Sequence, residues 1–332
     1  MRVVIESPVA NDEAEHAWLV RIQHTFEDGW HLWSVDIDDL EKLSSSSWLK
    51  DPGHAGKSAS EILRSSFTRS AYPSKLHQKV VRISAEPQEY PLTFAPKAAS
   101  HFLMQELTLL VEERESDGDF LKIVIRELGD DELKKHLFEL ERPAWRLDSR
   151  GGKSKMQDEI KRASASPVLP RLMVLCDSDR CSPSSAETED VRSLREACAS
   201  AGVPCWILQK REMENYLPAC LLEHRTKPGQ PLTHVFAAWC RLDERQKDFL
   251  DLKEGLKTKK GRPIDRDYED MLSNLSTEDR AVLERGGFGS KVGSDLWGQA
   301  WKGKAQVTAL DLQERDHKGE LGRLLDELRK QL

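Results

Sequence analysis

Seven acidic side chains stand in three short segments of the sequence, and grouped carboxylates of this kind can bind divalent cations. They are Glu112, Glu113 and Asp117, then Asp177 and Asp179, then Glu212 and Glu214. Magnesium takes oxygen ligands and usually binds only one or two carboxylates directly. Two ions about 3.5–4 Å apart can activate a water molecule and stabilise the leaving oxygen of a phosphodiester. The three groups therefore predict a site for one or two hard divalent cations.

Each acidic group follows a segment that is typical of a buried β-strand. Strands are predicted at residues 107–111, 172–176 and 205–208, with weaker patterns at 137–140 and 145–147. Helices are predicted at residues 120–128, 154–163 and 187–201, the last followed by a helix-ending Gly202. Alternating strands and helices favour a parallel sheet with helices on both faces. Ligands of such sheets bind beyond the carboxyl ends of the strands, where the acids fall.

The acids also have interpretations that need no ligand. Glu113 and Asp117 could stabilise the N-terminus of the helix that follows them, and Glu212 or Glu214 could be solvated helix acids. Asp177 and Asp179 are two residues apart, so in an extended segment both point to one side and can face one ion. The histidines and cysteines show no zinc-binding spacing, which leaves the carboxylates as the metal-ligating candidates.

Residues 107–217 resemble the TOPRIM domain, in the form found in OLD-family nucleases and related stand-alone phage-defence effectors. The segment LLVEERESDGDFL (109–121) is similar to the family's strand followed by Val-Glu-Gly-x-Ser/Thr-Asp. LMVLCDSDR (172–180) is similar to its Asp-x-Asp strand, and LQKREMENYLP (208–218) to its Ile-Glu-Asn-Tyr-Leu motif. Arg114 stands where the family prefers Gly, which leaves Glu112 as an alternative to Glu113, and Met213 replaces Ile.

The resemblance implies an endonuclease that hydrolyses nucleic-acid phosphodiester bonds with Mg²⁺ or Mn²⁺, expected as two ions. The metal ligands it implies are Glu113, Asp117, Asp177, Asp179 and Glu214. The catalytic residues it implies are Glu113, Asp177, Asp179 and Lys304, with Lys302 as the alternative lysine. The substrate contacts it implies are Gly152, Lys153, Lys210 and Arg211. DNA and RNA both remain open as the substrate.

The resemblance also implies a role in prokaryotic defence against phages. It further raises the question of whether a partner protein supplies an ATPase. OLD-family proteins carry an ATPase domain ahead of the TOPRIM domain, and residues 1–104 are too few for one. Residues 51–58 (DPGHAGKS) approach a phosphate-binding loop but lack its first glycine and the strand before it. We therefore expect no ATP site in this chain and a separate ATPase or sensor protein as a possible partner.

Three regions are expected. Residues 1–104 predict a small α+β domain of unassigned role, with strands at 3–5, 18–22 and 79–83 and with Trp30, Trp33 and Trp48 in its core. Residues 105–225 are the TOPRIM-like catalytic domain. Residues 226–332 are mostly helical and complete the site, with a basic loop at 257–262, a glycine-rich loop at 286–293 and an amphipathic helix at 320–332.

The composition limits the remaining classes. The net charge of 50 − 57 = −7 is compatible with a carboxylate site that a divalent ion would neutralise. There is no long apolar run and no signal-like N-terminus, and the six cysteines are irregularly spaced. We therefore expect a cytoplasmic protein with reduced thiols, no membrane contact and a homo-oligomeric state. The alternative to an enzyme is a TOPRIM-like interaction or regulatory subunit whose partner supplies the activity.

Overall fold

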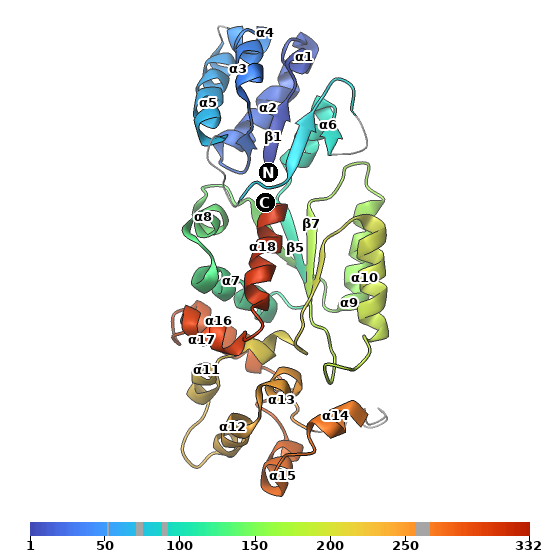
Figure 1. The fold of residues 1–332 in the computed structure, drawn as a ribbon, viewed down its shortest axis with the longest axis vertical. Helices are drawn as coiled ribbons and strands as arrows, with labels where there is room; N and C mark the ends of the chain where they lie inside the picture. Colours follow the sequence, from blue (N-terminus) through green and yellow to red (C-terminus); the bar gives the residue numbers. More distant parts are fainter. Residues whose placement is uncertain (52, 71–75, 88–91, 257–265) are drawn as a thin grey trace.

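The computed structural model describes residues 1–51, 53–70, 76–87, 92–256 and 266–332. The molecule is elongated, with two α/β units stacked along its long axis and a group of helices at the far end (Figure 1). Each α/β unit has its own four-stranded sheet. The first sheet comes from residues before 95 and the second from residues 107–207.

The first sheet is entirely parallel. Its strands are β1 (Arg2–Ile5), β2 (Leu32–Trp33), β3 (Val80–Ile83) and β4 (Thr93–Phe94), in the order β2-β1-β3-β4. Its helices are α1 (Ser7–Ala10), α2 (His16–Glu27), α3 (Ile37–Ser44), α4 (Ser47–Lys50), α5 (His54–Ser70) and α6 (Pro96–Leu103), with a 3₁₀ turn η1 (Glu13–Glu15). The unit is thus α/β, and the α+β expectation is wrong. Strands β2 and β4 have two residues each, too few to leave a period-two pattern in the sequence.

The strand predicted at residues 18–22 is wrong, because this segment lies inside α2. Leu19, Ile22 and Phe26 are buried at helical spacing and pack in the core of the first unit. Trp33 and Trp48 are buried in the core of the first unit, as predicted, whereas the buried Trp30 lies outside that cluster and donates a hydrogen bond to the carbonyl of Arg142 (3.0 Å). Residues 54–58, the end of the segment that approaches a phosphate-binding loop, form the first turns of α5.

The second sheet contains the strands that precede the acids. They are β5 (Leu107–Val111), β6 (Trp145–Ser149), β7 (Leu172–Cys176) and β8 (Cys205–Ile207), all parallel, in the order β6-β5-β7-β8. The helices of this unit are α7 (Ser116–Leu128), α8 (Asp131–Lys134), α9 (Lys153–Ser164) and α10 (Glu189–Ala201). Strand and helix predictions are confirmed here, including the left-handed Gly202 after α10. The weak strand at 137–140 is wrong, because residues 135–139 form a π-helical turn, η2 (Lys135–Glu139).

Helices cover both faces of the second sheet. Along β7, Met173 and Leu175 face the large core formed with α7, α16 (Val292–Trp301) and α18 (Glu320–Gln331). Leu172, Val174 and Cys176 face a second core under α9 and α10. Strands buried on both faces read as continuous apolar runs, which is why the sequence predicted β7 within its observed bounds.

The two sheets share one strand order. In each, the second strand in the sequence lies on one side of the first strand and the third on the other side. The chain therefore changes direction between β1 and β3, and again between β5 and β7. Loops leave opposite faces of a sheet at such a switch point, and this opens a crevice beyond the strand ends. The acids of the second unit follow β5 and β7, the strands on either side of its switch point.

The C-terminal helices are α11 (Ala219–His224), α12 (Pro231–Arg241), α13 (Glu244–Phe249), α14 (Arg266–Met271), α15 (Thr277–Arg285), α16, α17 (Ala309–Arg315) and α18, after a 3₁₀ turn η3 (Met213–Tyr216). Of these helices, α11 to α15 lie below the second sheet in Figure 1, whereas α18 runs alongside it. The basic loop predicted at 257–262 lies outside the described residues. The amphipathic terminal helix is confirmed as α18, whose Leu321, Leu324 and Leu328 are buried.

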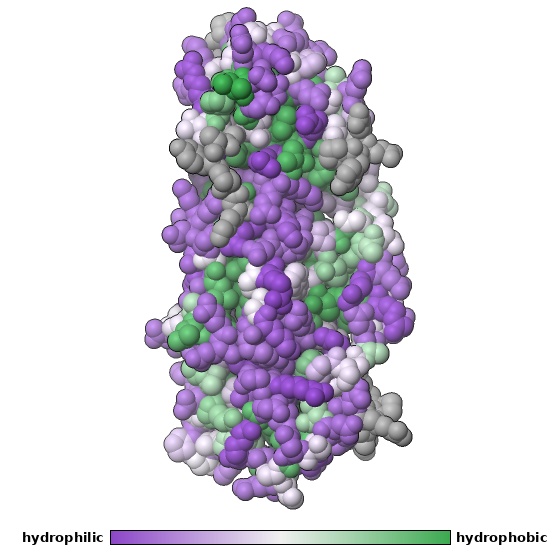
Figure 2. All heavy atoms as spheres, in the orientation of Figure 1, coloured by the Kyte–Doolittle hydropathy of each residue, from purple (hydrophilic) through white to green (hydrophobic). Residues whose placement is uncertain are grey.

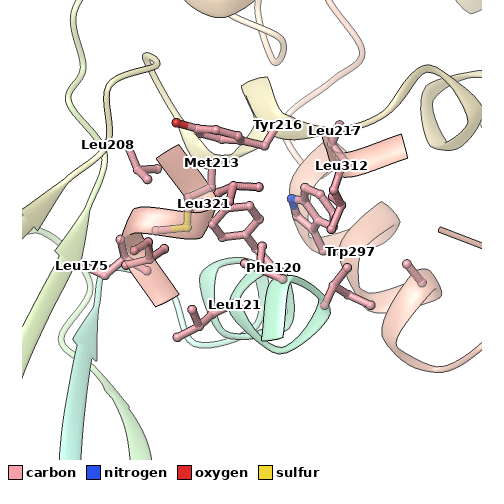
Figure 3. Close-up of a cluster of buried hydrophobic side chains, with 14 of the residues drawn as sticks. Phe120, Leu121, Leu175, Leu208, Met213, Tyr216, Leu217, Trp297, Leu312 and Leu321 are labelled. Atoms are coloured by element: carbon pink, nitrogen blue, oxygen red, sulfur yellow. The ribbon is translucent and has the colours of Figure 1, made fainter. Parts of the chain in front are cut away.

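Aromatic rings join α7, α16 and η3 beneath the acids. The ring of Phe120 lies 5.2 Å from that of Trp297 and 5.6 Å from that of Tyr216, between centroids. Figure 3 shows these three side chains packed with Met213, Leu217 and Leu312 in one cluster. Because the rings come from three elements, they fix the relative positions of the segments that carry Asp117, Glu214 and Gly293.

The face seen in Figure 2 is mostly hydrophilic, with hydrophobic patches beside α18. Among the helices of the described residues, none is both long and apolar enough to cross a bilayer.

Candidate metal centre

Glu112 and Asp179 share one ammonium group at the carboxyl edge of the second sheet. Nζ of Lys153 lies 2.5 Å from Oε1 of Glu112 and 2.8 Å from Oδ2 of Asp179. Lys153 begins α9 after Gly151 and Gly152, whose φ angles of 69° and 118° allow the tight turn before the helix. The two carboxylates raise the pKa of Lys153 above its ordinary value although burial opposes the shift. Lys153 is therefore charged and held by its two ion pairs.

Asp117 is buried and held by neighbours on its own segment. The backbone N–H of Glu113 donates to its Oδ2 (2.8 Å), and the hydroxyl of Ser116 donates to its Oδ1 (2.7 Å). Burial raises the pKa of Asp117 to about 6, and the negative charges of Glu112 and Glu113 add to the shift. Asp117 thus occupies a site where positive charge would be stabilising.

Of the two neighbouring glutamates, Glu112, the alternative, pairs with Lys153, and Glu113, the residue implied as the ligand, does not. The Glu113 side chain is exposed and accepts a hydrogen bond from Ser116 (3.3 Å), whereas the half-buried Glu112 reaches Lys153 and, through it, Asp179. Arg114 follows this pair where the family prefers Gly. The geometry brings the alternative residue, Glu112, into the group of acids and leaves Glu113 at its rim.

Asp177 and Asp179 take different partners. Oδ1 of Asp177 accepts the backbone N–H of Met213 (2.9 Å), while the backbone N–H of Asp179 donates to the carbonyl of Arg211 (3.0 Å). Asp179 has a φ of 54°, in the left-handed region, so the segment is not extended there. The expectation that both carboxylates face one side fails for this reason. Asp179 turns to Lys153 instead.

Glu212 and Glu214 share the second lysine of the site. Nζ of Lys253 lies 3.3 Å from Oε2 of Glu212 and 3.1 Å from Oε1 of Glu214. Burial raises the pKa of Glu212 to about 7 and also raises that of Glu214. The carboxylate of Glu214 also lies against Gly293, where a Cβ atom would overlap it. Glu214 is therefore fixed between the loop of Lys253 and the start of α16.

Asp177 interacts electrostatically with acids of both other groups. Loss of hydration raises its pKa well above the ordinary value, and the negative charges of Glu214 and Asp117 are the next largest causes. Unlike Glu112, Asp179, Glu212 and Glu214, neither Asp177 nor Asp117 has an ion pair to a lysine or arginine among the described residues. The centre of the group therefore has the fewest positive groups beside its carboxyl groups.

Lys210 and Arg211, expected at the substrate, are held in structural contacts. Nζ of Lys210 lies 2.7 Å from Oδ1 of the fully buried Asp248, and burial lowers the pKa of Lys210 to about 8. Arg211 pairs with Asp251 at 2.9 Å. Both side chains are largely inaccessible, so they position the loop after β8 rather than face a ligand.

Lys304 and Lys302 lie apart from the acids. Both are exposed and follow the last turn of α16, whereas the first turn of this helix contacts Glu214 through Gly293. The eight residue steps from Gly293 to Trp301, the last residue of α16, span roughly 12 Å along the helix axis. Among the described lysines, Lys153 and Lys253 are those that pair with the acids, and the sequence did not point to Lys253.

A second group of possible ligands lies beyond Lys210. Oxygen or nitrogen atoms of Glu244, Asp248 and His317 lie within 4.8 Å of one another. Asp248, however, is already surrounded by Lys210, Arg315 and Lys318. These cations satisfy its charge and would repel a metal ion, so we assign the group a structural role.

The equivalent edge of the first sheet has different chemistry. A cavity of about 510 Å³ lies there, lined by residues that include Glu6, Arg82, Ser84 and Glu86. Ser84 is the first residue after β3, the position that Asp177 has after β7. The described residues at this edge thus include the acids Glu6 and Glu86 beside Arg82, but a serine stands where the second unit has Asp177. No family model, curated protein or solved structure matches this chain.

Proposed function

We propose that this chain is a metal-dependent nuclease of the TOPRIM type that hydrolyses nucleic-acid phosphodiester bonds and serves in prokaryotic defence against phages. The observation that carries the proposal is that Asp117, Asp177 and Glu214 are buried acids from three segments at the switch point of the second sheet and act on one another electrostatically, although among the described residues no three of these acids have ligand atoms within 4.8 Å of one another. Carboxylates withdrawn from water need a proton or a cation beside them. Three of them from three segments favour a divalent cation.

The donor set fits Mg²⁺ or Mn²⁺, because all of its atoms are carboxylate oxygens. Asp117, Asp177 and Glu214 would hold the cation. When bound, such ions supply an activated water molecule and stabilise the charge on the phosphate. The chain itself fixes the direction of the carboxylates: Met213 N–H holds Asp177, and Ser116 with Glu113 N–H holds Asp117. Two-ion hydrolysis requires this preorganisation.

Cleavage assays with and without metal test the function. The full chain is incubated with plasmid DNA, linear DNA and total tRNA in Mg²⁺, Mn²⁺ or EDTA, beside the double variant Asp177→Asn/Asp179→Asn. We expect cutting of at least one substrate that requires metal and is lost in the variant. The exposed Glu139→Gln serves as the control that retains cutting.

Either of two results would reject the proposal as stated. Cutting that persists in the double variant would place the activity elsewhere in the preparation. Absence of cutting on all three substrates, with no Mn²⁺ binding by calorimetry, would favour the regulatory subunit that acts through a partner.

A further inference from the structure

The two lysines of the centre differ in how tightly they are held. Lys153 has a side chain that is 6% exposed, and its ion-pair distances are 2.5 and 2.8 Å. Lys253 has a side chain that is 32% exposed, and its distances to Glu212 and Glu214 are 3.3 and 3.1 Å. Lys253 can therefore reach solvent by rotating its side chain, whereas Lys153 is enclosed.

The backbone under Lys253 is rigidly built. Oδ1 of Asp251 accepts the backbone N–H groups of Lys253 (3.0 Å) and Glu254 (2.8 Å), while Oδ2 pairs with Arg211. From the glycine-rich loop, Gly289 N–H donates to the carbonyl of Lys253 (3.1 Å). A residue whose backbone is tied from both sides presents its side chain at a fixed point. Motion of the ammonium group is therefore limited to the side chain.

The charge that Lys253 compensates belongs to the candidate metal centre. Glu212 and Glu214 are 12% and 5% exposed at the side chain, and the carboxylate of Glu214 interacts electrostatically with those of Asp177 and Asp117. Buried carboxylates without a positive neighbour are strongly destabilising. A divalent cation beside Glu214 would give the same compensation and would also repel an ammonium group about 4 Å away. The ammonium group and the cation therefore compete for one carboxylate.

We propose that Lys253 is a displaceable counter-ion that sets the affinity of this centre for divalent cations. Its ammonium group pairs with Glu212 and Glu214 while the centre is free of metal, and it rotates toward solvent when a divalent cation takes Glu214. The residue thereby keeps the metal-free centre folded and raises the cation concentration needed to load it. This inference rests on the proposed metal centre, and Lys153 remains fixed in both states.

Calorimetric titration of the full chain with MnCl₂ tests the competition. The variants are Lys253→Gln, Lys253→Arg and, as a matched control, the exposed Lys161→Gln at the far end of α9. We expect Lys253→Gln to lower the Mn²⁺ Kd about tenfold, which corresponds to about 1.4 kcal/mol, and the other two variants to stay within about twofold of the parent chain. The charge-retaining Lys253→Arg separates the role of charge from that of shape.

The outcomes are distinguishable. An unchanged or weaker Mn²⁺ affinity in Lys253→Gln, with the parent chain binding normally, overturns the counter-ion role and leaves the metal centre standing. Absence of Mn²⁺ binding in the parent chain and all variants overturns both. If Lys253→Gln does not fold without metal, thermal unfolding is followed at rising MnCl₂. Stabilisation of the variant at lower Mn²⁺ than the parent chain supports the proposal, and equal or higher Mn²⁺ rejects it.

Discussion

The carboxylate of Glu214 lies against the backbone of Gly293, so that a side-chain carbon at position 293 would overlap it. Gly293 is in the first turn of α16, and Glu214 is in η3. The contact links the C-terminal region to the acids that follow the strands of the second sheet. A glycine inside a helix costs about 1 kcal/mol relative to alanine, so its presence here needs a packing reason. The reason is the space that Glu214 occupies.

Replacement of Gly293 by alanine is therefore expected to disturb the centre. The added methyl group must displace the Glu214 carboxylate, and we expect the Mn²⁺ Kd to rise about tenfold, a change of about 1.4 kcal/mol. Gly298→Ala, on the same helix, is the control, because its methyl group would meet only Asp119 at 3.5 Å, an ordinary contact. Calorimetry on both variants makes the comparison. Equal Mn²⁺ affinity of the two variants would contradict the packing argument.

Asp177→Asn should stabilise the metal-free protein while removing its response to metal. Asparagine can keep the hydrogen bond from Met213 N–H and removes the charge that Glu214 and Asp117 repel. We expect the metal-free variant to gain about 1–2 kcal/mol in free energy of unfolding at pH 7.5, as is common where function requires like charges to meet. Urea unfolding with and without MnCl₂ measures both effects. A destabilised variant would show that Asp177 is a purely structural acid.

The sequence predicted the second sheet well because its strands are buried on both faces. Residues 172–176 are apolar without a break and are bounded by Pro170 and Asp177, so only one element fits them. The segment at 18–22 (WLVRI) is apolar apart from Arg21 and lies in a longer helical pattern that includes Phe26. A run of five mostly apolar residues does not distinguish strand from helix, and tertiary packing decided it.

The site was predicted in part. The spacing of acids at strand ends indicated Asp117, Asp177 and Glu214, because topology brings strand ends together. The sequence left open whether Glu112 or Glu113 faces the other acids, because a shift of one residue along an extended segment exchanges the side chains on its two sides. Lys253 was missed because its position depends on contacts between its turn and the loop at 286–289, which are distant in sequence. Glycines that accept such close backbone approach were the one available signal.

Metal should stabilise the protein more at neutral than at acidic pH. Burial raises the pKa of Asp117 to about 6 and that of Glu212 to about 7, above their values in the unfolded chain. A carboxyl group with a raised folded pKa binds more protons in the folded state, so its contribution to stability is present below pH 4 and is lost as pH rises through 6 to 7. A divalent cation offsets this loss.

We therefore expect the rise in Tm caused by MnCl₂ to be small at pH 5 and to grow up to pH 7.5. Differential scanning fluorimetry at matched ionic strength measures it. Asp117→Asn should flatten the pH dependence, because it removes one of the carboxyl groups with a raised pKa. A metal effect that is independent of pH would exclude these carboxylates as its origin.

Arg171 joins the second sheet to the terminal helix and is expected to be a stability residue without influence on metal. It is buried at the junction of the two units, where its guanidinium group donates to the carbonyls of Gln105 (2.7 Å) and Gln331 (3.2 Å). Arg171→Met would leave two buried carbonyl groups without these donors, at a cost of about 2–4 kcal/mol in free energy of unfolding. The exposed Arg192→Met, whose ion pair lies on the surface of α10, should cost less than about 1 kcal/mol. Urea unfolding measures both variants, and an unchanged Mn²⁺ Kd in Arg171→Met would show that the junction and the metal centre are energetically separate. A weakened Mn²⁺ affinity would instead mean that the packing of the two units determines the geometry at the ends of β5 and β7.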